Sequence, residues 1–213
     1  MAYQFNGTNQ YLSIADNANL DVTGALTIAC FAKADTTITG TGPIISKWSS
    51  INNQRSYAIV IYQNKLYIDV ASLGTSASVV EIWGLTLIGT TQFHCAMSFN
   101  PATNFTAYLN GNIEATTSTG VPNTIFNSAT PLTIGYLPIN YFPGIISEVG
   151  IWNSALTAAE IASLAKGMTC DKVRPQSLVF YAPLVRNLQD VRGGLTITNN
   201  NAATVAAHPR VYA

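Results

Sequence analysis

Ten carboxylate side chains are the residues with which this chain of 213 amino acids could perform hydrolysis. Cleavage of a glycosidic bond takes two carboxylates that flank the bond, one as an acid and the other as a base or nucleophile. Side chains two residues apart on a strand point to the same face, where two carboxylates could act together. No two of the acids have this spacing on a predicted strand, although a pair could still meet across strands. We therefore predict no catalytic residue. The acids are Asp16, Asp21, Asp35, Asp69, Glu81, Glu114, Glu148, Glu160, Asp171 and Asp190.

The histidines and cysteines do not form the pattern of a nucleophile or a zinc site. The chain has no CxxC pair, no GxSxG, no P-loop and no GxGxxG. Cys30 and Cys95 lie in the middle of apolar runs, which predicts small core side chains. Cys170 follows the predicted helix in a connector, where we expect it to be accessible. His94 is expected to form hydrogen bonds on the outer face of a sheet, and His208 is expected to be structural.

Two tryptophans beside loop signals could bind sugars. Sugars stack their apolar faces on exposed aromatic rings, while amide and guanidinium groups bind the hydroxyls. Trp48 is followed closely by Asn52, Asn53 and Arg55, and Trp83 lies in EIWGL. These five residues are the glycan-binding candidates. The alternative interpretation is that both indoles anchor loops or form subunit contacts, where aromatic residues are enriched.

The elements that must position these residues are predicted to be strands. Gln63-Asn64 and Asn110-Gly111 are two-residue hairpin turns between such runs. The pattern favours an all-β fold, an antiparallel two-sheet sandwich. The predicted strands share an enrichment in β-branched and aromatic residues; they are 27–33, 55–62, 65–71, 93–100, 104–112, 131–137 and 145–152.

One short helix is predicted after the last of these strands. Thr157 and Glu160 have the spacing of a capping box, in which each side chain binds the other residue's amide. Ile161 and Leu164 then share one face. Gly167 can adopt the left-handed conformation that ends a helix. We expect this helix of about three turns to cover one end of the sandwich.

Composition restricts the classes of partner. Charged residues make up 9% of the chain, against about 25% in an average protein. Nucleic acid is excluded because no basic footprint exists, and no apolar run is long enough for a membrane span. The net charge of zero divides into −4 over residues 1–165 and +4 over residues 166–213. The basic segment could dock on the acidic part or on a neighbouring subunit, or remain solvated.

Four segments resemble the laminin-G-like branch of the concanavalin A-like jelly rolls. FNGTNQYLSI (5–14) resembles the opening strand of that family. LTIACFAKAD (26–35) resembles the family's strand that usually reads Thr-Ile-x-x-Trp-x-Lys. FHCAMSFN, followed by AYLNGN, resembles a His-containing strand and its hairpin. GIISEVGIWNSALTAAEI (144–161) resembles the closing motif. The resemblance covers about residues 3–167 and implies a jelly-roll sandwich.

The remaining segment is similar to tails of bacteriophage structural proteins that end in Ala-His-Pro-Arg-aromatic. Here the motif runs from Ala207 to Tyr212. We therefore expect a jelly-roll domain over 1–168 and an extension over 169–213 that packs on this domain or on a neighbouring subunit.

The tail resemblance implies a non-catalytic virion protein, either a capsid decoration protein or a tail accessory subunit. It would associate as a homo-oligomer, such as a trimer, and bind other virion proteins. An odd cysteine count and no evident signal peptide favour folding in host cytoplasm. The alternative is a glycan-binding, lectin-like module on a virion or cell surface. A glycosidase is the least favoured of the three functions.

The resemblance also implies a structural calcium ion, but two residues argue against it. Asn6 and Ser147 stand where family members carry ligand acids. Neutral oxygens alone bind calcium weakly. We therefore predict no metal or other cofactor, with Asp16 and Asp21 as the ligands if an ion does bind.

Overall fold

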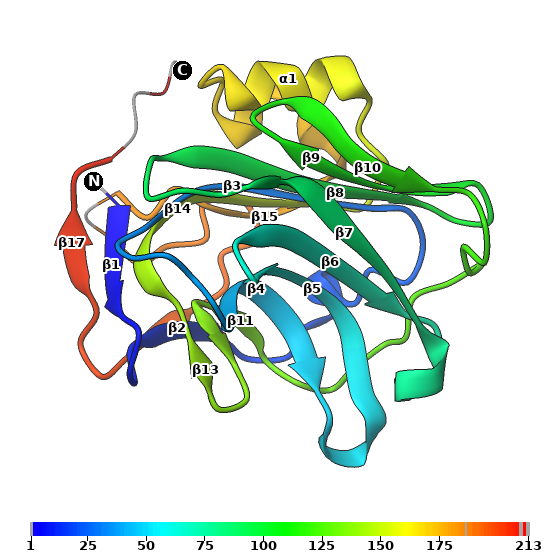
Figure 1. The fold of residues 1–213 in the computed structure, drawn as a ribbon, viewed down its shortest axis with the longest axis horizontal. Coiled ribbons are helices and arrows are strands. Elements are labelled where there is room, and N and C mark those ends of the chain that lie inside the picture. The colour runs from blue at the N-terminus through cyan, green and yellow to red at the C-terminus, as the bar shows by residue number, and fades with distance from the viewer. Residues whose placement is uncertain (1, 186, 209–210, 212–213) are drawn as a thin grey trace.

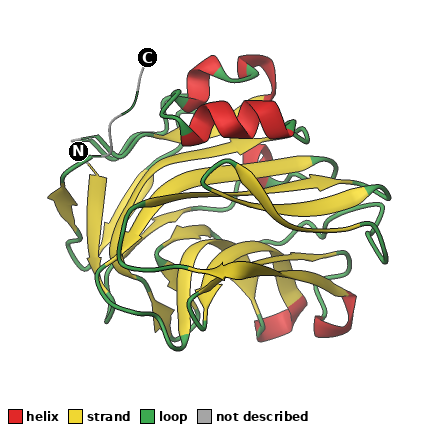
Figure 2. Cartoon of the chain, turned by 45° about the horizontal axis from the view of Figure 1, so that its top comes forward, coloured by secondary structure: helices red, strands yellow, loops and turns green. Residues whose placement is uncertain are grey.

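The chain folds as two antiparallel sheets packed face to face, which confirms the predicted all-β jelly-roll sandwich (Figure 1). The computed structural model describes residues 2–185, 187–208 and 211. Most of the regular secondary structure is strand, and the longest helix lies on the outside of one sheet (Figure 2).

Sheet A has eight strands among the described residues. Its order is β10-β9-β8-β3-β14-β1-β17, and β15 pairs with the second half of β14. The strands are β1 (Ala2–Asn6), β3 (Leu26–Ala34), β8 (Phe93–Asn100), β9 (Asn104–Leu109), β10 (Asn112–Thr117), β14 (Pro143–Trp152), β15 (Leu178–Ala182) and β17 (Thr204–Ala206).

Sheet B has seven strands in the described part of the chain, in the order β16-β2-β11-β4-β5-β6-β7. They are β2 (Tyr11–Ile14), β4 (Thr41–Ser49), β5 (Gln54–Tyr62), β6 (Lys65–Ala71), β7 (Val79–Leu87), β11 (Leu132–Ile134) and β16 (Ile197–Asn200). The short elements are the hairpin β12 (Tyr136–Leu137) and β13 (Asn140–Tyr141), and the 3-10 turns η1 (Ala18–Leu20), η2 (Ile51–Asn53), η3 (Ser76–Ser78), η4 (Cys170–Lys172) and η5 (Pro175–Ser177).

Both predicted hairpin turns form and set the register of their strands. Gln63 and Asn64 have φ values of 49° and 61°, and Asn110 and Gly111 have 51° and 81°. Positive φ at both central residues is the type I′ geometry, which matches the twist of the flanking strands. The first turn therefore fixes β5 against β6, and the second fixes β9 against β10.

The main core lies between the two sheets and is built from alternate residues of each strand. On β8, the side chains of Phe93, Cys95, Met97 and Phe99 all enter it, as the alternation predicts. The Cys95 sulfur lies 3.5 Å from that of Cys30, and both are buried free thiols. This confirms the prediction that they pack as small core side chains.

Helix α1 (Ala158–Ala165) has the start and stop predicted for it. Thr157 and Glu160 form the capping box. At the other end Gly167 has φ 100°, its N–H binds the Leu164 carbonyl, and Met168 N–H binds the Ser163 carbonyl. These two bonds make a Schellman cap. The helix is shorter than predicted, with eight residues rather than about three turns.

The place of α1 differs from the expectation that it covers an end of the sandwich. Helix α1 lies on the outer face of sheet A (Figure 1). Its Ile161 and Leu164 pack there over Ala29, Ala96 and the buried Trp152. The small side chains on β3 and β8 leave room for a helix there. The outer face of sheet A is thus partly covered, whereas no helix among the described residues covers sheet B in this way.

Two residues are more buried than the sequence predicts. Cys170 is 3% exposed because it lies in the second cluster under α1, so the expected accessibility is wrong. His94 is 2% exposed and packs edge-on against Phe31. Burial lowers the pKa of His94 to about 3, so this imidazole is a neutral packing residue rather than a surface hydrogen bonder.

The segment after residue 168 contributes a strand to three places in the sandwich. β15 pairs with β14, β16 with β2, and β17 with β1. Its Arg174 binds Glu160 of the capping box through two hydrogen bonds of 2.9 and 2.6 Å. Of the terminal motif, Ala207 and His208 are placed, whereas Pro209, Arg210 and Tyr212 lie outside the described residues.

Candidate functional site

The outer face of sheet B carries a group of aromatic and acidic side chains from three neighbouring strands. Successive side chains of a strand point to opposite faces. Ile61 of β5 and Ile68 of β6 are buried in the main core. The adjacent residues Tyr62, Tyr67 and Asp69 therefore lie on the outer face, away from the core.

Three aromatic rings gather on this face. The register places Tyr67 of β6 opposite Trp83 of β7. Their ring centroids are 4.7 Å apart with an interplanar angle of 76°, and Tyr62 meets Trp83 at 5.3 Å and 83°. Trp83 remains 42% exposed. The group, called here the aromatic triad, therefore offers an indole surface to solvent with two tyrosine rings beside it.

Two carboxylates stand next to the triad, on the same pair of strands. Asp69 lies directly opposite Glu81 in the β6–β7 register. Glu81 accepts a hydrogen bond from the Tyr67 hydroxyl and one of 3.4 Å from the Trp83 indole N–H. Asp69 is only 7% exposed, and its Oδ1 has no hydrogen-bond partner among the described residues. The pair thus combines one satisfied and one unsatisfied carboxylate.

The two carboxylates differ in protonation because their surroundings differ. Burial raises the pKa of Asp69, and the Glu81 charge raises it further, to about 8, although the nearby Tyr67 hydroxyl lowers it in part. Asp69 is therefore largely protonated at neutral pH. Such a group can donate or accept a hydrogen bond, and a nearby positive charge would ionise it.

A cavity of about 340 Å³ lies against the triad and is closed on one side by the β12–β13 hairpin. The hairpin is held on β4 and β11, because the hydroxyls of Ser46 and Thr133 donate to the Tyr136 carbonyl at 2.8 and 2.7 Å. This anchoring places the next residue, Leu137, in the cavity wall. The lining residues are Thr41, Val60, Tyr62, Tyr67, Asp69, Trp83 and Leu137.

The candidates around Trp48 lie at a second, smaller cavity beside the first. Trp48 and Arg55 are partners across β4 and β5, and both line this space of about 230 Å³. Leu137 and Pro138 close it from the hairpin. Because Leu137 lines both cavities, they adjoin, and the structure brings Trp48 and Arg55 to the same face as Trp83.

The two asparagines among the candidates lie slightly apart from these cavities. Asn52 and Asn53 form the exposed turn η2 and both have a φ of 55°. Arg55 donates to the Asn53 side-chain oxygen at 3.5 Å and to the Gly74 carbonyl at 3.2 Å. Neither asparagine lines either cavity, and of the two it is Asn53 that contacts the Arg55 guanidinium.

Sequence reasoning missed Tyr62, Tyr67, Asp69 and Glu81. Part of the signal was present, because the Gln63-Asn64 turn and the alternation of β5 and β6 place the first three on one face. The pairing of β6 with β7 was the missing information. Without it, a cross-strand carboxylate pair has no signature in the spacing of acids along the chain.

The residues near Asp16 and Asp21 do not fit the calcium ion that the family resemblance implies. The fully buried Lys47 ammonium forms ion pairs with both carboxylates, at 3.3 Å to Asp21, and also donates to the Ser128 and Thr130 carbonyls. An internal cation thus already occupies the centre of this oxygen set. Among the described residues, no three His, Cys, Asp or Glu side chains gather to hold a metal.

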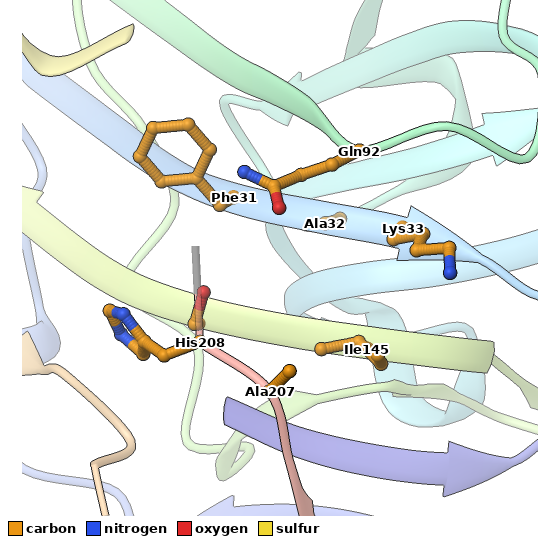
Figure 3. Close-up of a pocket in the computed structure, with 8 residues that line it drawn as sticks. Phe31, Ala32, Lys33, Gln92, Ile145, Ala207 and His208 are labelled. Atoms are coloured by element: carbon orange, nitrogen blue, oxygen red, sulfur yellow. The ribbon is translucent and has the colours of Figure 1, made fainter. Parts of the chain in front are cut away.

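A further cavity, of about 180 Å³, lies on the outer face of sheet A, and Figure 3 shows Ala207 and His208 reaching it. A bulge in β14 gives Glu148 a φ of 53° and turns its carboxylate toward Tyr181 and His208, at 2.5 and 2.9 Å. These contacts hold the C-terminal segment against β14, which agrees with a structural role for His208. The lining residues are Phe31, Ala32, Lys33, Gln92, Ile145, Ser147, Ala207 and His208.

Comparison with known families gives one match that covers most of the chain. A family model described as the concanavalin A-like lectin/glucanases superfamily matches residues 6–162. No similar sequence was found among curated proteins. No helix in the described part of the chain is long and apolar enough to cross a membrane.

Several solved structures have the same fold at low sequence identity. One is a candidate carbohydrate binding protein from Bacteroides ovatus, with a TM-score of 0.73 and 17% identity over 97% of this chain and 59% of that chain. Another is the CBM40 of a Ruminococcus gnavus sialidase bound to sialyllactose. Its TM-score is 0.62 and its sequence identity is 10%, over 77% of this chain and 96% of that chain. A third is the heptameric SAP-like pentraxin from Limulus polyphemus. Its TM-score is 0.59 and its sequence identity is 16%, over 94% of this chain and 95% of that chain. The chain thus spans 59% of the length of the first of these.

Proposed function

The chain belongs to the concanavalin A-like lectin/glucanases superfamily, and we propose that it binds glycans through the outer face of sheet B. The observation that carries this proposal is the 42% exposed Trp83 indole, set with Tyr62 and Tyr67 against a cavity of about 340 Å³. Ligand sites combine such apolar walls with a few polar groups that fix orientation. Asp69 and Thr41 supply polar groups here.

The adjoining cavity extends the same surface. Trp48 offers a second aromatic side chain, and Arg55 offers a donor that can bind two hydroxyls at once. An oligosaccharide could run from the Trp83 cavity past Leu137 to the Trp48 cavity. The similarity to the Bacteroides ovatus protein and to the sialidase CBM40 supports a carbohydrate ligand for this fold.

The proposal is binding without cleavage. Asp69 and Glu81 lie directly opposite each other on adjacent strands, so both lie on the same side of the cavity, with Asp69 in its lining and Glu81 beside it. A glycosidase places its two carboxylates on either side of the bond that it breaks. The oxygens of Glu81 are also bound to Tyr67 and Trp83. New reducing ends from a bound oligosaccharide, abolished in Asp69→Asn, would contradict this part of the proposal.

A glycan array followed by titration calorimetry tests the binding proposal. We expect the wild type to bind a defined set of glycans and Trp83→Ala to bind at least about tenfold more weakly, because one aromatic stacking surface is lost. Ile113→Ala is the matched control, since Ile113 is 58% exposed on β10 of the other sheet. A blank array, or equal affinities in Trp83→Ala and Ile113→Ala, would refute the proposed site.

We also propose a virion structural role as the second function. It is favoured by the resemblance of the tail, by a charged fraction of only 9%, and by exposed apolar side chains such as Leu85 and Leu87 on β7. Contacts with other copies of the chain would bury such residues. The heptameric pentraxin supports self-association within this fold.

Two measurements test the structural role. We expect a homo-oligomer by light scattering and the protein in purified phage particles. A monomer that is absent from particles would contradict both the expected assembly and the expected virion location.

A further inference from the structure

Building on the proposed glycan site, we propose that its ligand is an amino sugar whose free, protonated amino group binds between the aromatic triad and the two carboxylates. The proposal concerns the class of sugar rather than the presence of a glycan site. It rests on three features of the cavity, which are its aromatic walls, its unsatisfied buried acceptor and the sign of its charge.

The aromatic walls suit a cation as well as a sugar ring. Tyr62, Tyr67 and Trp83 are inclined to one another by 50° to 83°, so their faces and edges point in different directions around the cavity. The face of an aromatic ring attracts an ammonium group, and a tryptophan face does so most strongly. A sugar stacked here would present any amino substituent to this surface.

The buried acceptor calls for a donor from outside the protein. Asp69 lines the cavity and is only 7% exposed. Its Oδ1 has no hydrogen-bond partner among the described residues. A buried acceptor without a partner costs free energy, which a donor from a ligand would recover. An ammonium group brings several donors, and its charge strengthens each hydrogen bond to a carboxylate.

The charge of the cavity favours a cation over a neutral or anionic ligand. Its acidic groups are Asp69 in the lining and Glu81 beside it, whereas no basic residue is among the lining residues. Lys65 shares the outer face of β6 but lies nearer the β5–β6 turn, opposite Tyr62 and Leu87. A sialylated ligand would bring a further negative charge beside Glu81 and Asp69, and we expect this cavity to reject it.

A cation should also change the protonation of the cavity. In the free protein, burial and Glu81 raise the pKa of Asp69 to about 8. A bound cation favours the ionised carboxylate, so binding releases a proton at neutral pH. Affinity for a probe that stays protonated over this range should therefore rise with pH, by up to about tenfold per unit, and level off above about pH 8.

The decisive experiment compares two oligosaccharides that differ only in acetylation. Tetramers of glucosamine and of N-acetylglucosamine are titrated into the wild type at pH 6. We expect the free amine to bind at least about tenfold more tightly. Asp69→Asn should reduce that affinity by about ten- to a hundredfold, since a hydrogen bond to a charged group is lost. Equal affinities for the two tetramers, or preference for the acetylated one, would overturn the proposal.

A second measurement needs no variant and so does not depend on folding. Ethylammonium stays protonated between pH 6 and pH 8 and keeps three N–H donors, and ethanol serves as its neutral control. We expect only the charged probe to protect the accessible tryptophan fluorescence, to which the 42% exposed Trp83 contributes, from quenching, and more strongly at pH 8 than at pH 6. A pH-independent response, or an equal response to the neutral probe, would contradict a cation site.

The two proposals fail in different ways. If neutral glycans bind through Trp83 and the glucosamine tetramer has no advantage, the glycan site stands and the amino-sugar assignment is wrong. If no glycan binds at all, the glycan function is wrong and the amino-sugar assignment falls with it, whatever the response to ethylammonium.

Discussion

At the scale of single residues, Lys47 is the side chain whose surroundings depart most from its ordinary behaviour. A lysine is almost never fully buried unless it is paired. Here the ammonium is paired with Asp16 and Asp21 and bound by two carbonyls, all from loops at the rim of sheet B. It therefore ties these loops together in the way that a bound metal ion would, and does so from within the chain.

This arrangement predicts a calcium-independent protein that depends on Lys47. Because the ammonium occupies the oxygen set, we expect neither calcium nor EDTA to change the Tm of the wild type. Lys47→Met leaves two carboxylates without their cation and should lower the free energy of unfolding by about 3 kcal/mol. Urea denaturation measures this, with the exposed Lys33→Met as the control. A Tm that falls in EDTA, or equal effects of the two substitutions, would be inconsistent with this role.

Asp69 predicts a specific dependence of stability on pH. Its pKa of about 8 in the folded state is raised above the unfolded value of 3.8, so the folded protein holds the proton more tightly. The stabilisation that comes from this proton is therefore complete below about pH 4 and is lost as pH rises toward 8, by up to about 1.4 kcal/mol per pH unit. Asp69→Asn cannot titrate and should lose this slope.

The measurement is urea denaturation of the wild type and Asp69→Asn at pH 5 and pH 8. We expect the variant to gain stability relative to the wild type at the higher pH. Asp171→Asn serves as the control, since Asp171 is half exposed and lies away from the cavity. If the wild type and Asp69→Asn show the same pH slope, the carboxyl does not titrate as described.

At the scale of elements, the edge of sheet B shows how an exposed strand is protected. β7 ends the sheet, so one side of it has unpaired amides, which invite pairing with other chains. Glu114 of β10 reaches across from sheet A and accepts from the amides of Leu85, at 2.6 Å, and Thr86. One side chain thus closes this rim of the sandwich and covers the edge.

Removing that carboxylate should expose the edge. Glu114→Ala is expected to lower the free energy of unfolding by about 1–2 kcal/mol, since two amides lose their acceptor, and to increase aggregation on heating. Glu114→Gln keeps an acceptor oxygen and should restore most of the stability. Light scattering during thermal unfolding follows both effects. Identical behaviour of Ala and Gln variants would show that the contact is unimportant.

The C-terminal segment is an element whose role can be tested by a core residue of its own. We propose that residues 169–213 fold as one unit with the body, since Phe180 of β15 is fully buried in the main core. Phe180→Ala should then lower the free energy of unfolding of the whole chain by about 3–4 kcal/mol in one transition. Val191→Ala, at a residue 52% exposed, is the control. Two separate transitions, or no loss of stability, would show that the segment is independent.

At the scale of the whole molecule, the two sheets differ in what covers their outer faces. Helix α1, η4 and β15 form a second cluster on sheet A, whereas sheet B keeps an open face with two adjoining cavities. Packing therefore covers part of one face, and the proposed ligand contacts lie on the other.

The parts that the sequence predicts are those set by local chemistry. The Thr157–Glu160 capping box, the Gln63-Asn64 turn and the alternation of β8 depend on neighbours along the chain, and all are present. The position of α1 and the burial of Cys170 depend on which strands lie beneath them, and there the sequence misleads. The Asp69–Glu81 pair lies beyond such reasoning because the β6–β7 register brings it together.

The most direct test of the glycan site uses the indole N–H signals of the three tryptophans in a ¹H–¹⁵N spectrum. Trp83 lies in the proposed site, Trp48 lines the adjoining cavity, and Trp152 donates to the buried Val173 carbonyl at 2.8 Å beneath α1. On titration with an oligosaccharide that the array selects, we expect the Trp83 signal to move most and the Trp152 signal to stay in place. A bound oligosaccharide that leaves Trp83 unmoved would place the ligand elsewhere and contradict the account.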